Sequence, residues 1–495
     1  MFTPVLDSIL FFMVSLPIVG WLAQKIGLNR IRDVYAILGF MLSGYALIGL
    51  YEEVSKSRII LIKIATFGPP LGACLVIDTL SIFMAFTFLL LSIFVSVYSV
   101  RYMEHETRVT EYYALFLGMV AGMIGVVFAG DFFTFFIFWE LMCVTSYVLV
   151  AFRKELWAPI EAAFKYLIMS TFGSVTIFFA MSFLYGMVGT LNFAHLATSI
   201  RTVTPNYWLY LTIAMIVVGF GIKAAIVPFH TWLPDAHPEA PSSVSALLSG
   251  ILIACGIYGL SRILILIFNP AQFQWGILVA ILSVITMTIG NFMALLQSDV
   301  KRLLAYSSIA HIGYILVGVA VATETGLGGA FLHVFNHSLM KGLAFLCAGA
   351  FIHQAGTRKL NELAGIGRRM PISAFVFCVA LLALLGVPSL NGFISKLILV
   401  KAAIEANASI LAIVLVINSV FSAAYYLRIM QIIMLASPAR KIAKVKEAPL
   451  AMVIPMCMMA LLIVFFGVYP EPVTVFAEKT ASAILNVQEF IKLVY

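Results

Sequence analysis

Long unbroken apolar runs dominate this chain of 495 residues. A helix needs about 20 consecutive apolar residues to cross the hydrocarbon core of a bilayer. Runs of that kind recur along the whole sequence, separated by short polar segments. We expect about fourteen membrane-spanning helices, near residues 5–23, 34–51, 75–100, 112–129, 131–152, 162–188, 206–227, 241–268, 275–297, 303–322, 328–352, 372–403, 409–434 and 450–469.

The composition supports the same fold class. Hydrophobic residues make up 63% of the chain and charged residues 11%, whereas a soluble protein averages roughly half and a quarter. Lipid offers no partners for open strand edges, and a closed barrel would show short segments of alternating hydrophobicity. The sequence therefore predicts an all-α polytopic membrane protein without a separate soluble domain.

The basic residues predict an orientation. Lys and Arg number 30 and Asp and Glu 22, for a net charge of +8, and the basic residues lie mostly in short loops. This placement is typical of membrane topology signals and excludes a nucleic-acid interface. Because most loop cations follow odd-numbered spans, the positive-inside rule predicts both termini on the outer side of the plasma membrane. The first helix is expected to be retained, because it lacks the features of a signal peptide, and residues 472–495 are expected at the membrane interface.

Motifs for a cofactor or for hydrolytic chemistry are missing from the sequence. None of the six cysteines forms a CxxC pair, which argues against a disulfide framework, a zinc site or an iron–sulfur cluster. There is no phosphate-binding or dinucleotide-binding glycine motif and no GxSxG nucleophile motif. We expect neither a cofactor nor a catalytic residue on this chain.

Two predicted spans are interrupted by helix breakers and also carry a lysine. Lys223 precedes Pro228 in the seventh span, and Pro388 precedes Lys396 in the twelfth. Paired broken helices in inverted repeats are typical of ion sites in transporters. The alternative is a pair of ordinary proline kinks with snorkelling lysines. The spacing predicts four regions: helices 1–3 (1–111), a first five-helix repeat (112–268), an inverted second repeat (269–434), and helix 14 with the tail (435–495).

Glu140 and Lys223 are charged residues at predicted bilayer depth. Each would be costly alone in the membrane, so we expect them to pair with one another. A buried lysine beside a carboxylate can load and release a proton when the balance between desolvation and attraction changes. The alternative is a static ion pair that fixes helix packing.

A second group of titratable residues lies on the tenth, eleventh and twelfth spans. His333 and His337 are four residues apart and share a helix face with Lys341 nearby. Together with His311 and Lys396 they predict a polar axis through the bundle, in which histidines pass protons near neutral pH. Metal binding by His333 and His337 is a weaker alternative, because no carboxylate or thiolate accompanies them.

Several motifs resemble those of a known family. They are Trp139-Glu140, the stretch from Gly221-Ile222-Lys223 to Trp232-Leu233-Pro234-Asp235-Ala236, and Asp299-Val300-Lys301-Arg302 followed by Leu303-Leu304-Ala305-Tyr306-Ser307-Ser308. Over about residues 75 to 430 the chain resembles the antiporter-like membrane subunits of respiratory complex I, Mrp-type cation/proton antiporters and membrane-bound hydrogenases. The resemblance implies fourteen helices, inverted repeats, and partner membrane subunits.

The resemblance also implies roles for the charged residues. Glu140 would be the partner carboxylate and Lys223 the proton-loading lysine of a first half-channel. His333, His337 and Lys341 would belong to the central hydrated axis, and Lys396 would be the exit-side lysine of the second half-channel.

One position departs from the family pattern. Relatives place a lysine or histidine on the eighth helix, where this chain has Ala254; Ser249 or water could bridge the gap, or the link could be broken. The expected function is proton translocation, with sodium/proton exchange as a variant, in a multisubunit redox-driven or antiport complex. The alternatives are a non-conducting scaffold subunit and a stand-alone solute carrier.

Overall fold

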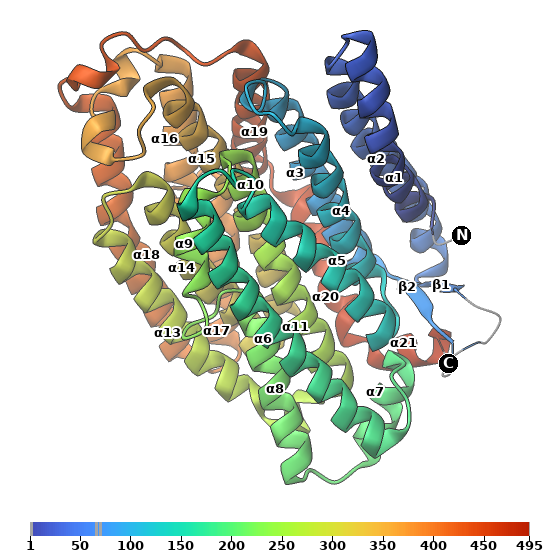
Figure 1. Cartoon of the computed structure of the whole chain (residues 1–495). Coiled ribbons are helices and arrows are strands. Elements are labelled where there is room, and N and C mark those ends of the chain that lie inside the picture. Colours follow the sequence, from blue (N-terminus) through green and yellow to red (C-terminus); the bar gives the residue numbers. More distant parts are fainter. Residues whose placement is uncertain (1–2, 65–67, 69–71, 495) are drawn as a thin grey trace.

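Twelve helices among the described residues are long and apolar enough to cross a membrane. The computed structural model describes residues 3–64, 68 and 72–494, and its helices form one elongated bundle (Figure 1). These spans are α1 (Pro4–Ile26), α2 (Arg30–Ser57), α3 (Thr79–Tyr102), α4 (Val109–Phe128), α5 (Phe132–Val150), α6 (Trp157–Val188), Ser242–Ile267, α13 (Trp275–Leu295), α14 (Val300–Val321), α15 (Glu324–Ala355), Ser409–Leu435 and α19 (Leu450–Val468). The mainly helical membrane fold predicted from the sequence is confirmed.

Shorter helices and two strands complete the fold. The Ser242–Ile267 span consists of α10 (Ser242–Leu247), the π-helical η1 (Leu248–Leu252) and α11 (Ile253–Ile267), and Ser409–Leu435 consists of α18 (Ser409–Met430) and the π-helical η4 (Gln431–Leu435). The remaining elements are β1 (Ile60–Lys63), β2 (Cys74–Ile77), α7 (Phe193–Thr202), α8 (Tyr207–Lys223), α9 (Trp232–Glu239), α12 (Pro270–Phe273), η2 (Leu360–Leu363), η3 (Ile366–Arg368), α16 (Pro371–Leu385), α17 (Asn391–Glu405), η5 (Arg440–Ile442), α20 (Glu471–Leu485) and α21 (Val487–Val494).

Burial separates the central helices from the peripheral ones. In the most apolar 18-residue stretch of α15, 94% of the residues are buried, and in that of Ser242–Ile267 all are buried. In α1 and α2 the corresponding share is 33%. In Figure 1, α1 and α2 lie side by side at one edge of the bundle. A polar residue on α15 is therefore removed from lipid, which is where intramembrane charges are tolerated.

The start of the third predicted span is wrong. Residues 75–77 belong to strand β2, which pairs antiparallel with β1 through Ile60 and Ile77. Helix α3 begins only at Thr79, because the Asp78 side chain accepts a hydrogen bond from the Ser81 N–H and caps it. Continuous apolar character does not separate a short buried strand from the end of a helix.

Both predicted helix breaks lie between helices. Helix α8 ends at Lys223, and Pro228 follows in the segment before α9. Helix α16 ends at Leu385 and is capped by Gly386, whose φ of +91° favours glycine, and Pro388 lies before the start of α17. Each break exposes backbone groups of a helix end inside the bundle.

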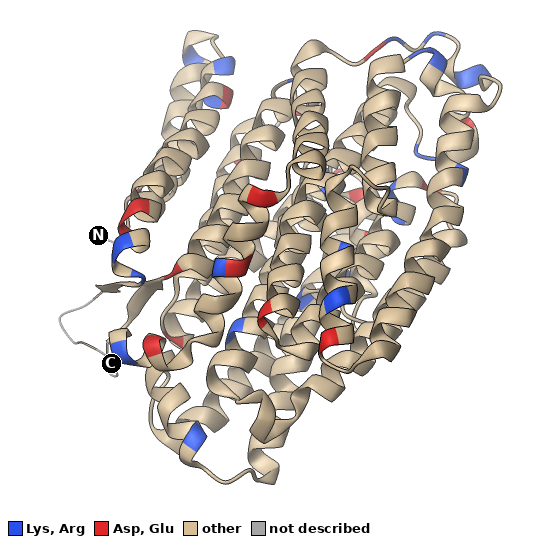
Figure 2. Ribbon diagram, turned by 180° about the vertical axis from the view of Figure 1, so that it is seen from behind, with Lys and Arg blue, Asp and Glu red and all other residues tan. Residues whose placement is uncertain are grey.

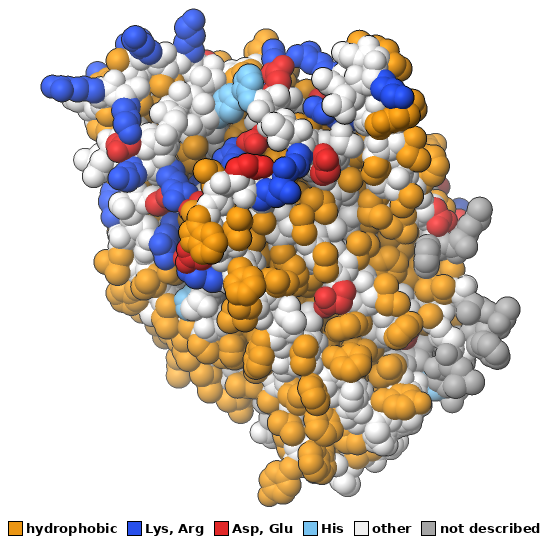
Figure 3. Space-filling view, viewed as in Figure 1, with side chains coloured by type: hydrophobic (Ala, Val, Ile, Leu, Met, Phe, Trp, Pro, Cys, Tyr) orange, Lys and Arg blue, Asp and Glu red, His pale blue; other side chains and the backbone are white. Residues whose placement is uncertain are grey.

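Charge and hydrophobicity are distributed as a bilayer requires. Lys and Arg gather on the loops at one end of the bundle, and other charged residues lie within its helices (Figure 2). Hydrophobic side chains cover most of the lower part of the face in Figure 3. The tail predicted at the interface forms α20 and α21, and α20 packs against α15 and α3.

Candidate ion-translocation site

Lys223 is held in an aromatic pocket at the end of α8. Its side chain is buried, and Nζ donates a hydrogen bond of 2.7 Å to the Tyr166 hydroxyl. Nζ lies 4.9 Å and 5.6 Å from the ring centroids of Tyr166 and Tyr147. The Tyr166 hydroxyl also contacts Ser146 Oγ at 2.9 Å, and its ring stacks on Trp232 at 4.1 Å. A phenol oxygen and aromatic faces therefore stabilise this ammonium.

The direct Glu140–Lys223 ion pair predicted from the sequence is not formed. Among the described residues no ion pair includes Glu140, and its Oε1 is buried without a hydrogen-bond partner. Glu140 lies on α5 between Ile137 and Val144, which share its side of the helix and are about half exposed. The carboxylate thus lies near the outer flank of the bundle, whereas Tyr166 holds Lys223 in the interior.

Two of the predicted histidines are in direct contact. His311 Nδ1 on α14 and His333 Nε2 on α15 are 3.0 Å apart, with parallel rings. His333 Nδ1 is 2.8 Å from Ser395 Oγ on α17, and the Tyr426 hydroxyl on α18 is 3.3 Å from His311 Nε2. These four side chains form a continuous hydrogen-bonded line, which we call the histidine line. Ring nitrogens can donate or accept, so proton positions along this line can reverse.

His337 lies beside the histidine line without joining it. Its ring centroid is 5.4 Å from that of His311 and 6.5 Å from that of His333. Its Nε2 is buried and has no hydrogen-bond partner among the described residues. A water molecule is the usual partner of such an atom in a polar interior.

The two buried lysines of the second half lie near the histidine line, with Lys341 Nζ 5.9 Å from the Tyr426 ring centroid. Lys341 donates to Ser307 Oγ and, at 3.1 Å, to the Leu304 carbonyl. Lys396 donates to the carbonyls of Leu384 and Leu385, at 2.9 and 3.0 Å, where α16 ends. A helix C-terminus carries partial negative charge, so the break at Gly386 creates a binding place for this ammonium.

A pair of hydroxyls lies about one helical turn from Ala254, the position at which the family resemblance implies a basic residue. Ser249 Oγ, in the π-helical η1, is 2.6 Å from Ser308 Oγ on α14. Ser308 donates to the Leu304 carbonyl, which also accepts from Lys341. Ala254 is buried one turn further along and offers no polar side chain. The polar contacts of Lys341 thus extend to η1 through the Leu304 backbone carbonyl and the two serine hydroxyls.

Sequence reasoning did not find the most deeply buried ion pair. Arg262 Nη1 on α11 is 2.5 Å from Asp78 Oδ2, and both side chains are at most 2% exposed. Asp78 also caps α3 through the Ser81 N–H. The available signal was Arg262 itself, because a lone arginine in an apolar span requires a partner.

Hydroxyl groups around the charges were also missed. Tyr166, Ser395 and Tyr426 bind the predicted charged or titratable residues directly. In the sequence, the only indication of these hydroxyl groups is that Ser and Tyr recur inside the apolar spans. Such residues are too common in membrane helices to identify a site by themselves.

Comparison with known proteins places this geometry in a family. A family model described as NADH:quinone oxidoreductase/Mrp antiporter, transmembrane, matches residues 129–422, and one described as the N-terminus of complex I chain 5 matches residues 64–113. The chain belongs to the NADH:quinone oxidoreductase/Mrp antiporter family. The matched region contains the aromatic pocket of Lys223, both helix breaks and three of the four side chains of the histidine line, with Tyr426 just beyond its end.

Relatives and a solved structure agree with that assignment. The chain is 34% identical to F(420)H(2) dehydrogenase subunit N of Methanosarcina mazei, over 83% of this chain and 85% of the relative. It is 32% identical to NADH-quinone oxidoreductase subunit N of Desulforudis audaxviator, with the same shares covered. A chain of the membrane-bound sulfane sulfur reductase, an archaeal respiratory membrane complex, superposes with a TM-score of 0.91 at 26% identity over 99% of both chains. The predicted family is confirmed, and its members include subunits of multisubunit membrane complexes.

Proposed function

We propose that this antiporter-like subunit moves protons through its second half along the histidine line. The observation that carries the proposal is the unbroken contact from Tyr426 through His311 and His333 to Ser395. A histidine can accept a proton on one nitrogen and release one from the other, so a contact of 3.0 Å between two rings supports transfer without a large movement. Sodium exchange is a variant that the same polar interior would tolerate.

The lysines supply the driving interactions in this proposal. Lys341 and Lys396 are both buried close to the histidine line. Among the described residues, neither ammonium group binds a carboxylate. Two ammonium groups in a low-dielectric interior repel one another more strongly than in water. A proton that arrives on one lysine therefore favours release from the other, through the histidines between them.

The two halves are linked, in this proposal, through Ser249 and Ser308. Their hydroxyls replace the basic side chain that Ala254 cannot provide. Hydroxyls relay protons by rotating, and water completes the remaining distance toward Lys223. Ser249 thus takes the bridging role that the sequence left open.

Glu140 is proposed to act at the boundary with another membrane subunit. It lies half-buried beside exposed apolar residues of α5, where a carboxylate facing lipid alone would be costly. A partner subunit would provide the missing partner, and a charge change there would act on Lys223 over a distance. Energy then comes from the neighbouring subunits or from an ion gradient, since the sequence contains no motif for a redox centre.

The finer topology also belongs to the proposal. If α8 and the α16–α17 pair each complete one crossing in addition to the twelve long spans, the chain crosses the membrane fourteen times. The two breaks then occupy equivalent places in inverted five-helix repeats, 112–268 and 269–434. The excess of loop cations favours termini on the outer side of the plasma membrane.

The decisive experiment compares variants in the assembled complex reconstituted into vesicles. Lys223→Met and Lys341→Met should abolish or strongly reduce proton transport, followed with an entrapped pH-sensitive dye, while size-exclusion chromatography shows intact assembly. Lys401→Met is the matched control, because Lys401 is exposed and its one ion pair among the described residues is with Glu405. Unchanged transport in both buried-lysine variants would contradict the proposal.

A scaffold role without conduction is the second candidate. Two observations favour this role. Ala254 stands where the family resemblance implies a basic side chain, and Glu140 does not bind Lys223. A scaffold would tolerate the Lys→Met substitutions with transport unchanged, and removing the whole subunit would disrupt assembly. The number of buried polar contacts in the second half opposes this role, since a scaffold gains nothing from them.

A further inference from the structure

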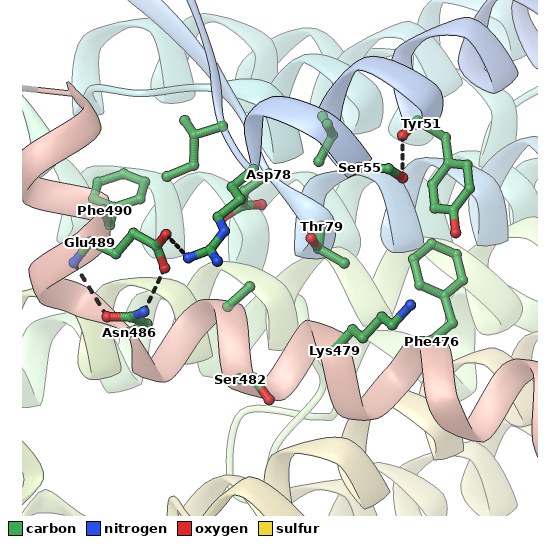
Figure 4. A pocket seen from close by; sticks show the side chains of 14 residues that line it. Tyr51, Ser55, Asp78, Thr79, Phe476, Lys479, Ser482, Asn486, Glu489 and Phe490 are labelled. Carbon is green, nitrogen blue, oxygen red and sulfur yellow. Dashed lines mark hydrogen bonds and ion pairs between the residues drawn. The ribbon is translucent and has the colours of Figure 1, made fainter.

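A polar pocket lies at the end of the bundle where both termini are found. It has a volume of about 520 Å³ and opens between the end of α2, the start of α3, and α20 and α21 (Figure 4). The family match begins at residue 64 and ends at residue 422, so α2 and α20 lie outside it. None of the contacts proposed for proton movement involves this pocket.

One cation in the pocket has no partner. Lys479 on α20 forms no ion pair or hydrogen bond with any described residue, and its side chain points into the pocket between Thr79 and Tyr51 (Figure 4). The two carboxylates of the pocket are both neutralised: Asp78 pairs with Arg262, and Glu489 pairs with Arg58. The pocket therefore has one uncompensated positive charge beside hydroxyl and amide donors.

An apolar groove continues from the same pocket. It also measures about 520 Å³, runs between α2 and α3, and shares Tyr51 and Phe476 with the polar pocket. Their ring centroids are 5.6 Å apart, and they form the boundary between the two cavities. Along the groove the lining is almost entirely apolar, with Gly44 on α2 leaving room opposite Ile93 on α3.

The level of the two cavities in the membrane is set by the helix ends. Span α2 ends at Ser57 and span α3 begins at Thr79, so the polar pocket lies where the headgroup region begins. The groove extends from there along both spans, at the level of the hydrocarbon core. Together the two cavities offer a cationic side chain for a phosphate group and an apolar groove for an acyl chain.

We propose that this composite cavity binds one anionic phospholipid. Lys479 binds the phosphate, the hydroxyl and amide groups near Thr79 and Asn486 bind the headgroup, and one acyl chain occupies the groove past Gly44. The charge selects an anionic headgroup, because only Lys479 is uncompensated. The continuous groove selects a lipid rather than a free phosphate. The lipid fills the space between α2 and α3 at the edge of the bundle.

The test uses the full chain purified in detergent and exposed to defined lipids. Native mass spectrometry counts bound molecules of palmitoyl-oleoyl phosphatidylglycerol or palmitoyl-oleoyl phosphatidylcholine in separate titrations. We expect one phosphatidylglycerol to bind about fivefold more tightly than phosphatidylcholine, as one basic side chain near a headgroup provides. Lys479→Gln should remove that preference, while Lys492→Gln, which changes the same charge on α21 outside the pocket, should keep it.

A second pair of variants tests the groove. Gly44→Leu fills it, because a Cβ there meets only Ile93 at 3.8 Å, and it should prevent retention of either lipid. Gly49→Leu is the control: it lies on the same helix, a Cβ there meets nothing within 4 Å, and it does not line the groove. The midpoint of thermal unfolding, measured for every variant, identifies any that fail to fold.

Three outcomes would overturn the proposal. Equal binding of the two lipids, unaffected by Lys479→Gln, would show that the pocket does not recognise the headgroup. Competition by glycerol phosphate as strong as by the intact lipid would show a phosphate site alone. If a photoreactive residue in place of Ile48 captured a partner chain rather than phosphatidylglycerol in the assembled complex, the groove would be a subunit interface. If the photoreactive residue at position 48 captures phosphatidylglycerol in a chain that keeps Lys479, the proposal is supported even if Lys479→Gln does not fold.

Discussion

The Lys223 ammonium donates to the Tyr166 hydroxyl at 2.7 Å, while the carboxylate expected to bind it, Glu140, lies elsewhere on α5. A lysine bound to a neutral oxygen is easier to discharge than one bound to a carboxylate, because neutralising the ammonium leaves no buried anion behind. The contact therefore fits a group that gains and loses a proton better than it fits a fixed ion pair.

Tyr166→Phe should slow proton transport by about tenfold with assembly intact. The substitution removes the hydrogen-bond acceptor of Lys223, and a hydrogen bond to a charged group contributes about 1.5–3 kcal/mol. Proton uptake into reconstituted vesicles measures the effect. Tyr147→Phe is the matched control, because that hydroxyl bonds to Ser170 and not to Lys223; an equal loss in both variants would contradict the role given to Tyr166.

The Arg262–Asp78 pair should be the most sensitive stabilising contact of the described chain. Arg262→Met leaves a buried carboxylate unpaired and should lower the free energy of unfolding by about 3–5 kcal/mol. Asp78→Asn leaves the arginine unpaired and should cost a similar amount, whereas the double variant should be less destabilised than the sum. Thermal unfolding in detergent measures all three. Lys401→Ala, which breaks an exposed pair, should cost less than about 1 kcal/mol.

Local chemistry explains which features the sequence could predict. The break between α16 and α17 follows from Gly386 and Pro388, whose backbone preferences act within a few residues. The burial of His333, His337 and Lys341 follows from their common helix, because their cost in lipid requires an interior position. These predictions needed no knowledge of which helices are neighbours.

Partner identities could not be predicted, because they depend on helix packing. His333 contacts His311 on the preceding helix and Ser395 on α17, and spacing along a single helix cannot reveal either partner. Glu140 and Lys223 are both charged and both at membrane depth, but helix rotation turns one toward the bundle flank and the other toward Tyr166. The β1–β2 hairpin escaped notice because its second strand is as apolar as a span.

His333→Gln and His337→Gln should differ in effect although the residues are four apart on one helix. His333 connects His311 with Ser395, so its loss interrupts the histidine line and should reduce transport at least about tenfold. His337 Nε2 has no partner among the described residues, so its loss removes no hydrogen bond there and should cost about threefold or less. Vesicle proton uptake measures both; the reverse order would show that the conducting contact runs through His337.

Ser249→Ala and Ser308→Ala should each reduce transport, and the double variant should be no slower than the worse single one. Both hydroxyls belong to one contact of 2.6 Å, so removing either already breaks it. Ala254, about one turn further along, supplies no polar group that could replace this contact. Ser283→Ala, whose hydroxyl donates to the Gly313 carbonyl away from the two lysines, controls for the loss of a buried hydroxyl. Additive losses in the double variant would mean that the two serines act on separate water paths and that the halves are not linked through their contact.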